Sequence, residues 1–359
     1  MPAISDIKPE PVHQWLPLEK GFLLVAGPCS VESRDQLIKT IEGLVATGKK
    51  IVVRAGIWKP RSRPGEFEGV GAKALPWLDE VRTATGLPMA VEVARPKHVE
   101  LCLKHNIDLI WLGARTTVNP FMVQEIANAI KGIGIPVMIK NPVSPDLRLW
   151  VGAVERISMA GTNKIIAIHR GFHTHLKSVY RNIPLWNIPL QMSIEIPGLP
   201  VICDPSHIAG DKTLIRQVAI KAMALGMNGL MIETHHQPQN ALTDPLQQIT
   251  PATFNQLIDE ITSLKEKEDD ENTLQSIRLH IDELDYQLLE LLAKRFALSP
   301  DVGKLKKKLG KSVVQPARQE DLFRDREEKA KALGLNISFV NTLMQMLHNE
   351  SVVLQHNHE

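Results

Sequence analysis

Short apolar runs alternate with longer amphipathic stretches between residues 21 and 265. Eight runs are rich in β-branched residues: 22–26, 50–54, 89–93, 109–112, 136–140, 164–169, 200–203 and 229–232. Each is almost continuously apolar, which is typical of parallel strands buried on both faces. Helix-like periodicity falls between most of them, over 33–47, 71–85, 96–105, 119–131 and 210–225, and is weakest over 171–199. This rhythm predicts a (β/α)8 TIM barrel over residues 1–264.

The pattern changes after residue 264. Residues 265–272 form a charge run without apolar positions, which predicts a linker. Beyond it, apolar residues recur every three or four positions from Leu274 to Phe296, and two further helices are expected over 318–333 and 338–354. Residues 273–359 are therefore predicted to form a small all-α, three-helix domain. Such a small core favours self-association, so we expect at least a homodimer through this domain, with a tetramer left open.

Polar residues gather where the predicted strands end. They are Cys29, Lys59, Arg61, Glu92, Arg115, Lys140, His169, Arg170, Asp204, His207 and Glu233. A barrel builds its active site at the carboxyl ends of its strands. A lone lysine or arginine is usually a solvated surface charge, but their shared placement predicts convergence on one site. Cations in this arrangement suit a substrate that carries phosphate and carboxylate groups.

Four residues of metal-ligand types stand in distinctive local settings: three of the polar residues above, Cys29, His207 and Glu233, and a further one, Asp244. A thiolate, an imidazole and two carboxylates suit one divalent ion such as Mn, Fe, Co or Zn. Such a mixed set favours a Lewis-acid role over a structural one. A second pair, His173 and His175, lacks matching carboxylates, so we interpret it as polar rim.

Composition narrows the class of protein. The net charge is +2 with 23% charged residues, which argues against nucleic-acid binding. No apolar stretch approaches the roughly 18 residues of a membrane helix, and no signal peptide is expected at the amino terminus. Three cysteines without a C-x-x-C pair fit a reducing compartment. We therefore expect a cytoplasmic enzyme.

Five motifs of the barrel resemble type Iβ 3-deoxy-D-arabino-heptulosonate 7-phosphate (DAHP) synthase. They are Gly-Pro-Cys-Ser at 27–30, Lys-Pro-Arg at 59–61, Gly-Ala-Arg at 113–115, His-Arg-Gly at 169–171 and Asp-Pro-Ser-His at 204–207. The resemblance implies condensation of phosphoenolpyruvate with erythrose 4-phosphate, on a metal held by the four residues above. It assigns Arg115, Lys140 and Arg170 to phosphoenolpyruvate. It assigns Lys59, Arg61 and Ser62 to erythrose 4-phosphate.

Two barrel residues receive chemical roles as hypotheses. Lys140 is expected to donate a proton to the aldehyde oxygen, because burial beside a cation lowers a lysine pKa. Glu92 is expected to orient the attacking water. The alternative activity is 3-deoxy-D-manno-octulosonate 8-phosphate synthase, which uses arabinose 5-phosphate. The loop that begins at Lys59 favours erythrose 4-phosphate, although Arg63 adds a charge to the usual motif.

The helical tail resembles the all-α chorismate mutases. The spacing of Arg295 and Lys306 places them within roughly 20° of one helix face. The set in register with that family is Arg278, Arg295, Lys306, Arg318, Gln319, Ser351 and Gln355. The resemblance implies rearrangement of chorismate to prephenate, with Arg278 supplied by a partner subunit and with Lys306 and Gln355 on the ether oxygen. Ser299-Pro300 predicts a kink that could misalign Arg295 and Lys306.

Three interpretations remain open on sequence alone. The chain is a synthase and a mutase, or a synthase whose tail senses chorismate or prephenate, or a barrel whose tail only dimerises. The full set of cations argues against the third, because dimerisation alone needs apolar faces. Since the chain has no long segment before its first strand, feedback inhibition is predicted to act through the tail.

Overall fold

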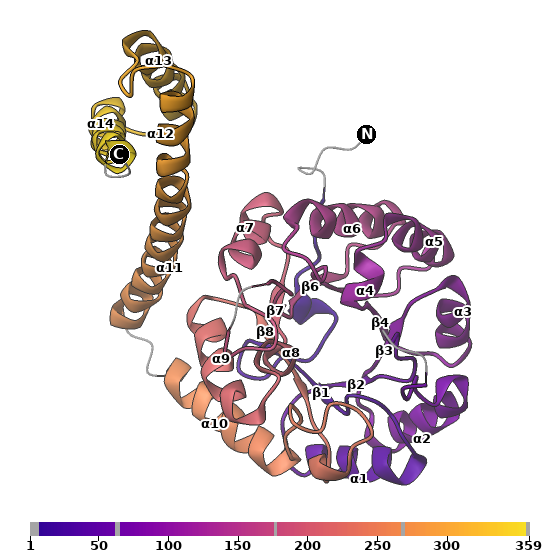
Figure 1. Cartoon of the computed structure of the whole chain (residues 1–359). Helices are drawn as coiled ribbons and strands as arrows, with labels where there is room; N and C mark the ends of the chain where they lie inside the picture. The colour runs from indigo at the N-terminus through magenta and orange to yellow at the C-terminus, as the bar shows by residue number, and fades with distance from the viewer. Residues whose placement is uncertain (1–6, 62–64, 176–177, 267–269, 357–359) are drawn as a thin grey trace. The chain divides into compact units, whose positions relative to one another are not determined.

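The computed structural model describes residues 7–61, 65–175, 178–266 and 270–356 (Figure 1). The chain divides into two compact units, Met1–His280 and Ile281–Glu359. No described helix is both long enough and apolar enough to cross a membrane.

Eight parallel strands close the first unit into a barrel in chain order. They are β1 (Leu23–Gly27), β2 (Val52–Ala55), β3 (Met89–Val93), β4 (Leu109–Leu112), β5 (Val137–Lys140), β6 (Ile165–His169), β7 (Val201–Cys203) and β8 (Gly229–Glu233). All eight predicted strands are present, each within two residues of its expected bounds. The barrel closes where β1 pairs with β8 in the register Leu23↔Gly229 to Gly27↔Glu233. This register brings the residues that follow β1 beside the end of β8.

Most helices of the first unit surround the barrel as an outer ring, whereas the two short helices that directly follow β4 and β7 lie inside this ring, nearer the strands (Figure 1). In chain order, the helices around the barrel are α1 (Arg34–Val45), α2 (Leu75–Thr85), α3 (Pro96–Lys104), α4 (Ala114–Thr117), α5 (Pro120–Ile130), α6 (Leu147–Met159), α7 (Asn187–Glu195), α8 (Pro205–Ala209), α9 (Lys212–Ala224) and α10 (Pro251–Glu266). Short 3-10 turns are η2 (Val12–Gln14), η3 (Gly71–Ala74) and η4 (Pro238–Asn240). Side-chain caps fix several starts, as where Ser33 accepts from the backbone of Gln36 before α1.

The core of the barrel has two layers because neighbouring residues of a strand point to opposite faces. Leu24 and Ala26 of β1 pack outward against the helices, whereas Leu23 and Val25 pack inward with Trp111 and other strand residues. Val12 and Leu16, which precede β1, join the inner layer. This packing makes the barrel a solid core and leaves its chemistry to the ends of the strands.

Four helices follow the barrel: α11 (Asp270–Ala297), α12 (Ser299–Lys308), α13 (Pro316–Ala332) and α14 (Ile337–His356). The long helix is interrupted at the predicted point, and Pro300 lies in the first turn of α12, where a missing N–H costs nothing. α14 packs against both α12 and α13. The predicted linker 265–272 overlaps the end of α10 and the start of α11, so its boundaries stay a prediction.

Candidate active sites

The carboxyl ends of the barrel strands surround a cavity of about 290 Å³. Among the described residues, six lysine and arginine side chains line its walls, those of Lys59, Arg61, Arg115, Lys140, Arg170 and Arg181. Glu92, His207 and Asp244 also line it. Five of these cations were expected from sequence. The sixth, Arg181, comes from the connection between β6 and α7.

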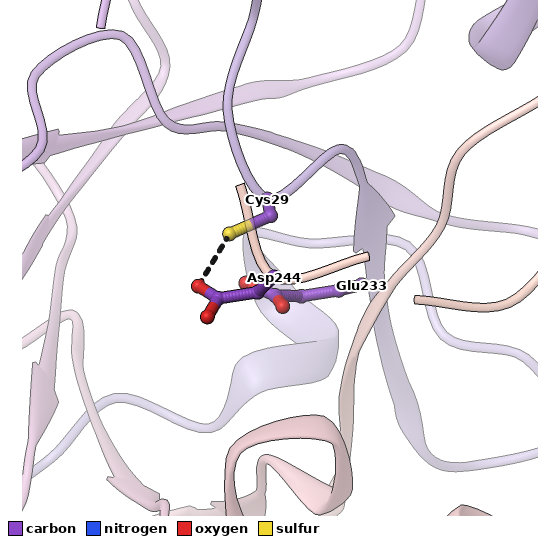
Figure 2. Close-up of side chains that lie close together, drawn as sticks. All are labelled: Cys29, Glu233 and Asp244. Atoms are coloured by element: carbon purple, nitrogen blue, oxygen red, sulfur yellow. Dashed lines mark hydrogen bonds between the residues drawn. The ribbon is translucent and has the colours of Figure 1, made fainter. Parts of the chain in front are cut away.

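Three of the four expected metal ligands form a compact group at this cavity (Figure 2). One ligand atom each from Cys29, Glu233 and Asp244 lies within 4.8 Å of the other two. His207 lies at the edge of the group, with its Nε2 3.8 Å from Glu233 Oε1. The structure therefore brings all four residues together, and the imidazole stands slightly outside the compact three.

Hydrogen bonds between distant loops hold Cys29 and Asp244 in place. The Cys29 backbone N–H donates to Gln248 Oε1 at 3.0 Å, and Gln248 Nε2 donates to the Thr243 carbonyl at 2.8 Å. Ser30 and Thr243 hydroxyls are 2.7 Å apart. These contacts tie the loop after β1 to the loop before α10. Asp244 itself has a left-handed backbone with φ of 48°, a conformation that Asp tolerates better than most residues.

The imidazole of His207 is oriented by a buried carboxylate. Asp204 Oδ2 lies 2.8 Å from His207 Nδ1 and accepts from Lys140 Nζ at 2.7 Å. A carboxylate behind a histidine is the usual support of a metal ligand, because it turns the other ring nitrogen toward the ion. Here that nitrogen faces Glu233. Asp204 thus connects a candidate ligand to Lys140.

The donor group fits a divalent ion. Glu233 is fully buried, and its Oε1 accepts no hydrogen bond although Arg54 Nη2 lies 2.9 Å away. The Arg54 charge offsets part of the cost of burying this oxygen, and because the oxygen accepts no hydrogen bond it keeps lone pairs for a metal ion. Together with a thiol and a second carboxylate, it matches the ligands of borderline and first-row metals.

Burial and neighbouring charges shift the pKa values of three groups in the site, Cys29, Asp244 and Lys140. Burial and Glu233 raise the pKa of the Cys29 thiol to about 12, although Lys59 Nζ is only 3.0 Å from Cys29 Sγ. Burial also acts on Asp244, but Arg181 and His207 outweigh it and leave the pKa of that carboxyl below its usual range. Burial, reinforced by Arg54, lowers the pKa of Lys140 despite Asp204. The direction expected for Lys140 is confirmed.

Glu92 enters the cavity from β3 beside Gly113. A Cβ at Gly113 would lie 2.2 Å from Glu92 Oε1, so a side chain at this position would displace the carboxylate from its observed place. Arg115 follows on α4 and lines the same cavity. Arg61 pairs with Glu66 at 2.8 Å within its own loop. Ser62 and Arg63 of that loop lie outside the described residues, so the structure does not place them.

The site also contains two arginines, Arg54 and Arg181, for which no role was predicted from the sequence. Arg54 is buried within β2, its guanidinium lies over the Trp111 ring at 5.3 Å, and it pairs with Glu233. Arg181 pairs with Asp244 at 2.9 Å. The signal for Arg54 was a charge inside a strand buried on both faces, which demands a buried partner. Arg181 carried no such signal, because its segment has weak periodicity.

The second unit gathers four of the residues expected for the tail. Arg295 Nη1 donates to Ser351 Oγ at 2.6 Å and to the Leu347 carbonyl at 3.0 Å. Lys306 Nζ donates to Gln355 Oε1 at 3.1 Å. Ser351 and Gln355 are one turn apart on α14, so both cations reach the same face of one helix. The break at Ser299-Pro300 does not misalign them.

The other expected residues of the tail are not part of this hydrogen-bonded group. Arg318 is exposed and Gln319 half-buried on α13, and Arg278 is exposed on α11. Partial burial lowers the pKa of Lys306. The resemblance gives Arg278 to the partner's site, a role that a single chain does not test.

Comparison with known proteins finds a family for each of the two parts of the chain. Residues 18–267 match the family model described as DAHP synthetase I family. The chain belongs to this family. Residues 277–356 match the family model Chorismate mutase type II. With a DAHP synthase domain and a chorismate mutase domain, the chain is a bifunctional enzyme.

Curated relatives of the DAHP synthase domain carry two kinds of name. A phospho-2-dehydro-3-deoxyheptonate aldolase from Thermotoga maritima is 30% identical over 243 residues, 68% of this chain and 70% of the relative. A 2-dehydro-3-deoxyphosphooctonate aldolase from Acidithiobacillus ferrooxidans is 26% identical and covers 63% of this chain and 83% of the relative. The match to the first is stronger.

Two solved structures of DAHP synthases are similar to the barrel of this chain. The crystal structure of the DAHP synthase from Thermotoga maritima has a TM-score of 0.61 at 30% identity and covers 68% of this chain and 69% of that chain. A truncated form of the Thermotoga maritima enzyme gives 0.59 at 28% identity and covers 68% and 87%. The observed barrel topology is therefore that of the family.

Proposed function

We propose that the barrel condenses phosphoenolpyruvate with erythrose 4-phosphate to give DAHP and phosphate, with a bound divalent ion. The observation that carries the proposal is the group of Cys29, Glu233 and Asp244 beside a cavity walled by six cations. Both substrates are anions, and several fixed cations can hold them side by side. A Mn, Fe, Co or Zn ion on Cys29, His207, Glu233 and Asp244 would supply polarisation of the aldehyde carbonyl.

The protein's own groups account for binding. Arg115, Lys140 and Arg170 would hold the phosphate and carboxylate of phosphoenolpyruvate. Asn182 Oδ1 fixes the Arg170 guanidinium with a 2.8 Å hydrogen bond, so that this cation is oriented before substrate binds. Lys59, Arg61 and Ser62 would bind the erythrose 4-phosphate side. Arg61 would exchange Glu66 for a substrate phosphate.

The chemical step needs one proton delivered and one water placed. The enol carbon of phosphoenolpyruvate forms a bond to the aldehyde carbon, and the aldehyde oxygen takes a proton from Lys140, whose pKa is lowered by burial. Water, oriented by Glu92, adds its hydroxyl to the neighbouring carbon while its other proton restores Lys140, and the proton of the new hydroxyl passes to the departing phosphate as the ketone forms. The carbon–oxygen bond to phosphate then breaks, and inorganic phosphate leaves with the electron pair.

We propose that the second unit rearranges chorismate to prephenate. A pericyclic reaction needs no nucleophile, only a compact conformer and charge stabilisation at the ether oxygen. Arg295 would bind a carboxylate, with Arg318, Gln319 and Ser351 around it. Lys306 and Gln355, 3.1 Å apart, would donate to the ether oxygen. Arg278 would come from a partner subunit.

An exposed apolar stripe supports the proposed homodimer. Ile281, Leu284, Leu288 and Leu291 recur on one face of α11 and are 52–64% exposed in the single chain. A stripe of this kind on a helix is unusual unless another chain covers it. A second copy would bury it and complete the mutase site with Arg278. Further barrel contacts would extend the dimer to a tetramer.

We also propose cytoplasmic action and feedback inhibition by chorismate or prephenate. All three cysteines are free thiols, as a reducing compartment requires. Inhibition requires that the ligand bind two arrangements of the protein with different affinity. Synthase rates measured with saturating prephenate test this point, and unchanged rates would refute it.

The primary experiment follows phosphoenolpyruvate consumption with erythrose 4-phosphate, after EDTA treatment and with added Mn²⁺. Consumption restored by the metal supports the proposal. Consumption only with arabinose 5-phosphate would assign the chain to the octulosonate synthases. No consumption with either sugar would overturn the assigned metal site.

A further inference from the structure

Arg181 reaches both carboxylates of the candidate metal group. A single nitrogen, Arg181 Nη1, donates to Asp244 Oδ1 at 2.9 Å and to Gln247 Oε1 at 2.6 Å. Gln247 Nε2 in turn donates to Glu233 Oε2 at 2.7 Å. One arginine therefore contacts Asp244 directly and Glu233 through one buried amide.

These contacts divide the carboxylate oxygens into two sets. Asp244 Oδ1 and Glu233 Oε2 are engaged by the Arg181–Gln247 pair. Asp244 Oδ2 instead lies 3.3 Å from Cys29 Sγ. Glu233 Oε1, which also pairs with Arg54 at 2.9 Å, lies 3.8 Å from His207 Nε2. Each carboxylate thus keeps one oxygen outside the group and turns the other toward the remaining ligands.

The arginine also decides which way Gln247 points. A glutamine amide has an accepting oxygen and a donating nitrogen, whereas a guanidinium can only donate. Contact with Arg181 therefore requires the oxygen of Gln247 on its side and leaves the nitrogen for Glu233. Gln247 is only 1% exposed, so solvent does not compete for either atom.

The next residue, Asn182, contacts the backbone of His207, the imidazole ligand of the candidate group. Asn182 Nδ2 donates to the His207 carbonyl at 2.6 Å, while its Oδ1 accepts from Arg170 at 2.8 Å. The same two-residue segment thus contacts the backbone of the imidazole ligand and a carboxylate ligand. The segment lies in the connection that follows β6, and Arg181 brings it into direct contact with the loop that carries Asp244.

We propose that Arg181 is a positioning residue that, with Gln247, makes Glu233 and Asp244 each present one oxygen to the metal. The inference rests on the metal role proposed above for Cys29, His207, Glu233 and Asp244. Loss of Arg181 would change the affinity for a metal ion in opposite directions through its charge and through its effect on ligand orientation. Removing a positive charge near the site favours binding of a cation, whereas losing the orientation of two ligands weakens it.

The test is Co²⁺ titration of the metal-free, full-length protein, followed by the thiolate–cobalt absorption band. Arg181→Met and Gln247→Leu are each expected to weaken Co²⁺ binding by about 10–100-fold, as loss of an outer support typically does. Because the two residues act in series on Glu233, the double variant is expected to lose less than the product of the two single effects. The control is Arg216→Met, which removes an exposed guanidinium that pairs with Glu260 and contacts none of the four candidate ligands. This variant should bind Co²⁺ like the wild type.

The outcomes separate the two proposals. Equal or tighter Co²⁺ binding by both Arg181→Met and Gln247→Leu overturns the positioning role. Absence of a Cys29-dependent band in the wild type overturns the metal site itself. Urea unfolding of the metal-free variants shows whether the barrel persists. If Arg181→Met does not fold, Gln247→Leu decides the question, since it leaves the Arg181–Asp244 pair intact.

Discussion

At the scale of single residues, burial sets the chemistry of the barrel site. Lys140 and Asp204 are both buried, and Lys140 Nζ lies 2.7 Å from Asp204 Oδ2. Each charged group has therefore lost its contact with water and has the other as an ion-pair partner. Burial lowers the pKa of Lys140 more than Asp204 restores it. A lysine in this state releases its proton more readily than an exposed one, which suits a proton donor.

Lys140→Met is expected to lower the synthase kcat by about 100-fold or more, because it removes a proton donor and one anion contact. In the wild type, activity should fall as pH rises through the lowered pKa of Lys140, since the protonated form donates. Steady-state rates between pH 6 and 10 measure both effects. Lys97→Met, at an exposed lysine paired with Glu100, is the control. A Lys140→Met enzyme with near-normal kcat would contradict the assigned role.

A second residue-scale prediction concerns acid stability. The His98 ring stacks on Trp58 with centroids 4.0 Å apart, and burial together with Arg95 lowers the pKa of His98 to about 4, from 6.5. As pH falls from 6.5 to 4, the unfolded chain takes up a proton that the folded chain refuses, so stability declines. His98→Phe keeps a flat ring and should make this decline smaller.

Urea midpoints across pH 4–8 check the prediction for His98. Above pH 7 both proteins should respond to pH alike, which provides an internal control. Parallel loss of stability in wild type and His98→Phe between pH 6.5 and 4 would show that His98 does not titrate as proposed.

At the scale of elements, close packing of two helices brings together the residues of the proposed mutase site. A Cβ at Gly303 of α12 would lie 2.9 Å from the carbonyl oxygen of Gln355 on α14. The absence of a side chain lets α12 approach α14 closely enough for Lys306 to reach Gln355.

Gly303→Val is expected to force α12 away from α14, at a cost of about 1–3 kcal/mol in stability. Chorismate mutase turnover should fall because Lys306 and Gln355 separate, while synthase turnover stays unchanged. Parallel assays of both activities measure the difference. Lys304→Ala, at an exposed position on the same helix, is the control. Full mutase activity in Gly303→Val would contradict the packing argument.

At the scale of the whole molecule, the exposed stripe on α11 predicts the assembly. Leu284→Glu together with Leu288→Glu should place charges in the proposed dimer interface, where burying an unpaired charge is costly. We expect monomers by sedimentation, loss of mutase activity and retained synthase activity. Glu290→Ala, an exposed position on the same helix, should remain dimeric. A wild-type monomer with full mutase activity would refute the partner role of Arg278.

Much of the architecture and chemistry followed from the sequence itself. Buried parallel strands require continuous apolar runs, and this local signal located every strand within two residues of its bounds. Strand ends then predicted where Cys29, Lys140 and Glu233 would meet, since a barrel brings its carboxyl ends together. The sequence likewise predicted the interruption of the long helix at Ser299-Pro300, because proline restricts its own backbone.

Tertiary structure decided which side chains complete the sites. Gln248 meets the Cys29 backbone across 219 positions of the chain, and Arg181 meets Asp244 across 63. Loop paths determine such pairs, and loops carry no periodic pattern from which a path can be predicted. Arg54 shows the same limit inside a strand, because no role was predicted for it from the sequence and only the closed barrel supplied Glu233 as its partner. The sequence by itself determined the barrel and its ligand types, while the fold decided their orientation.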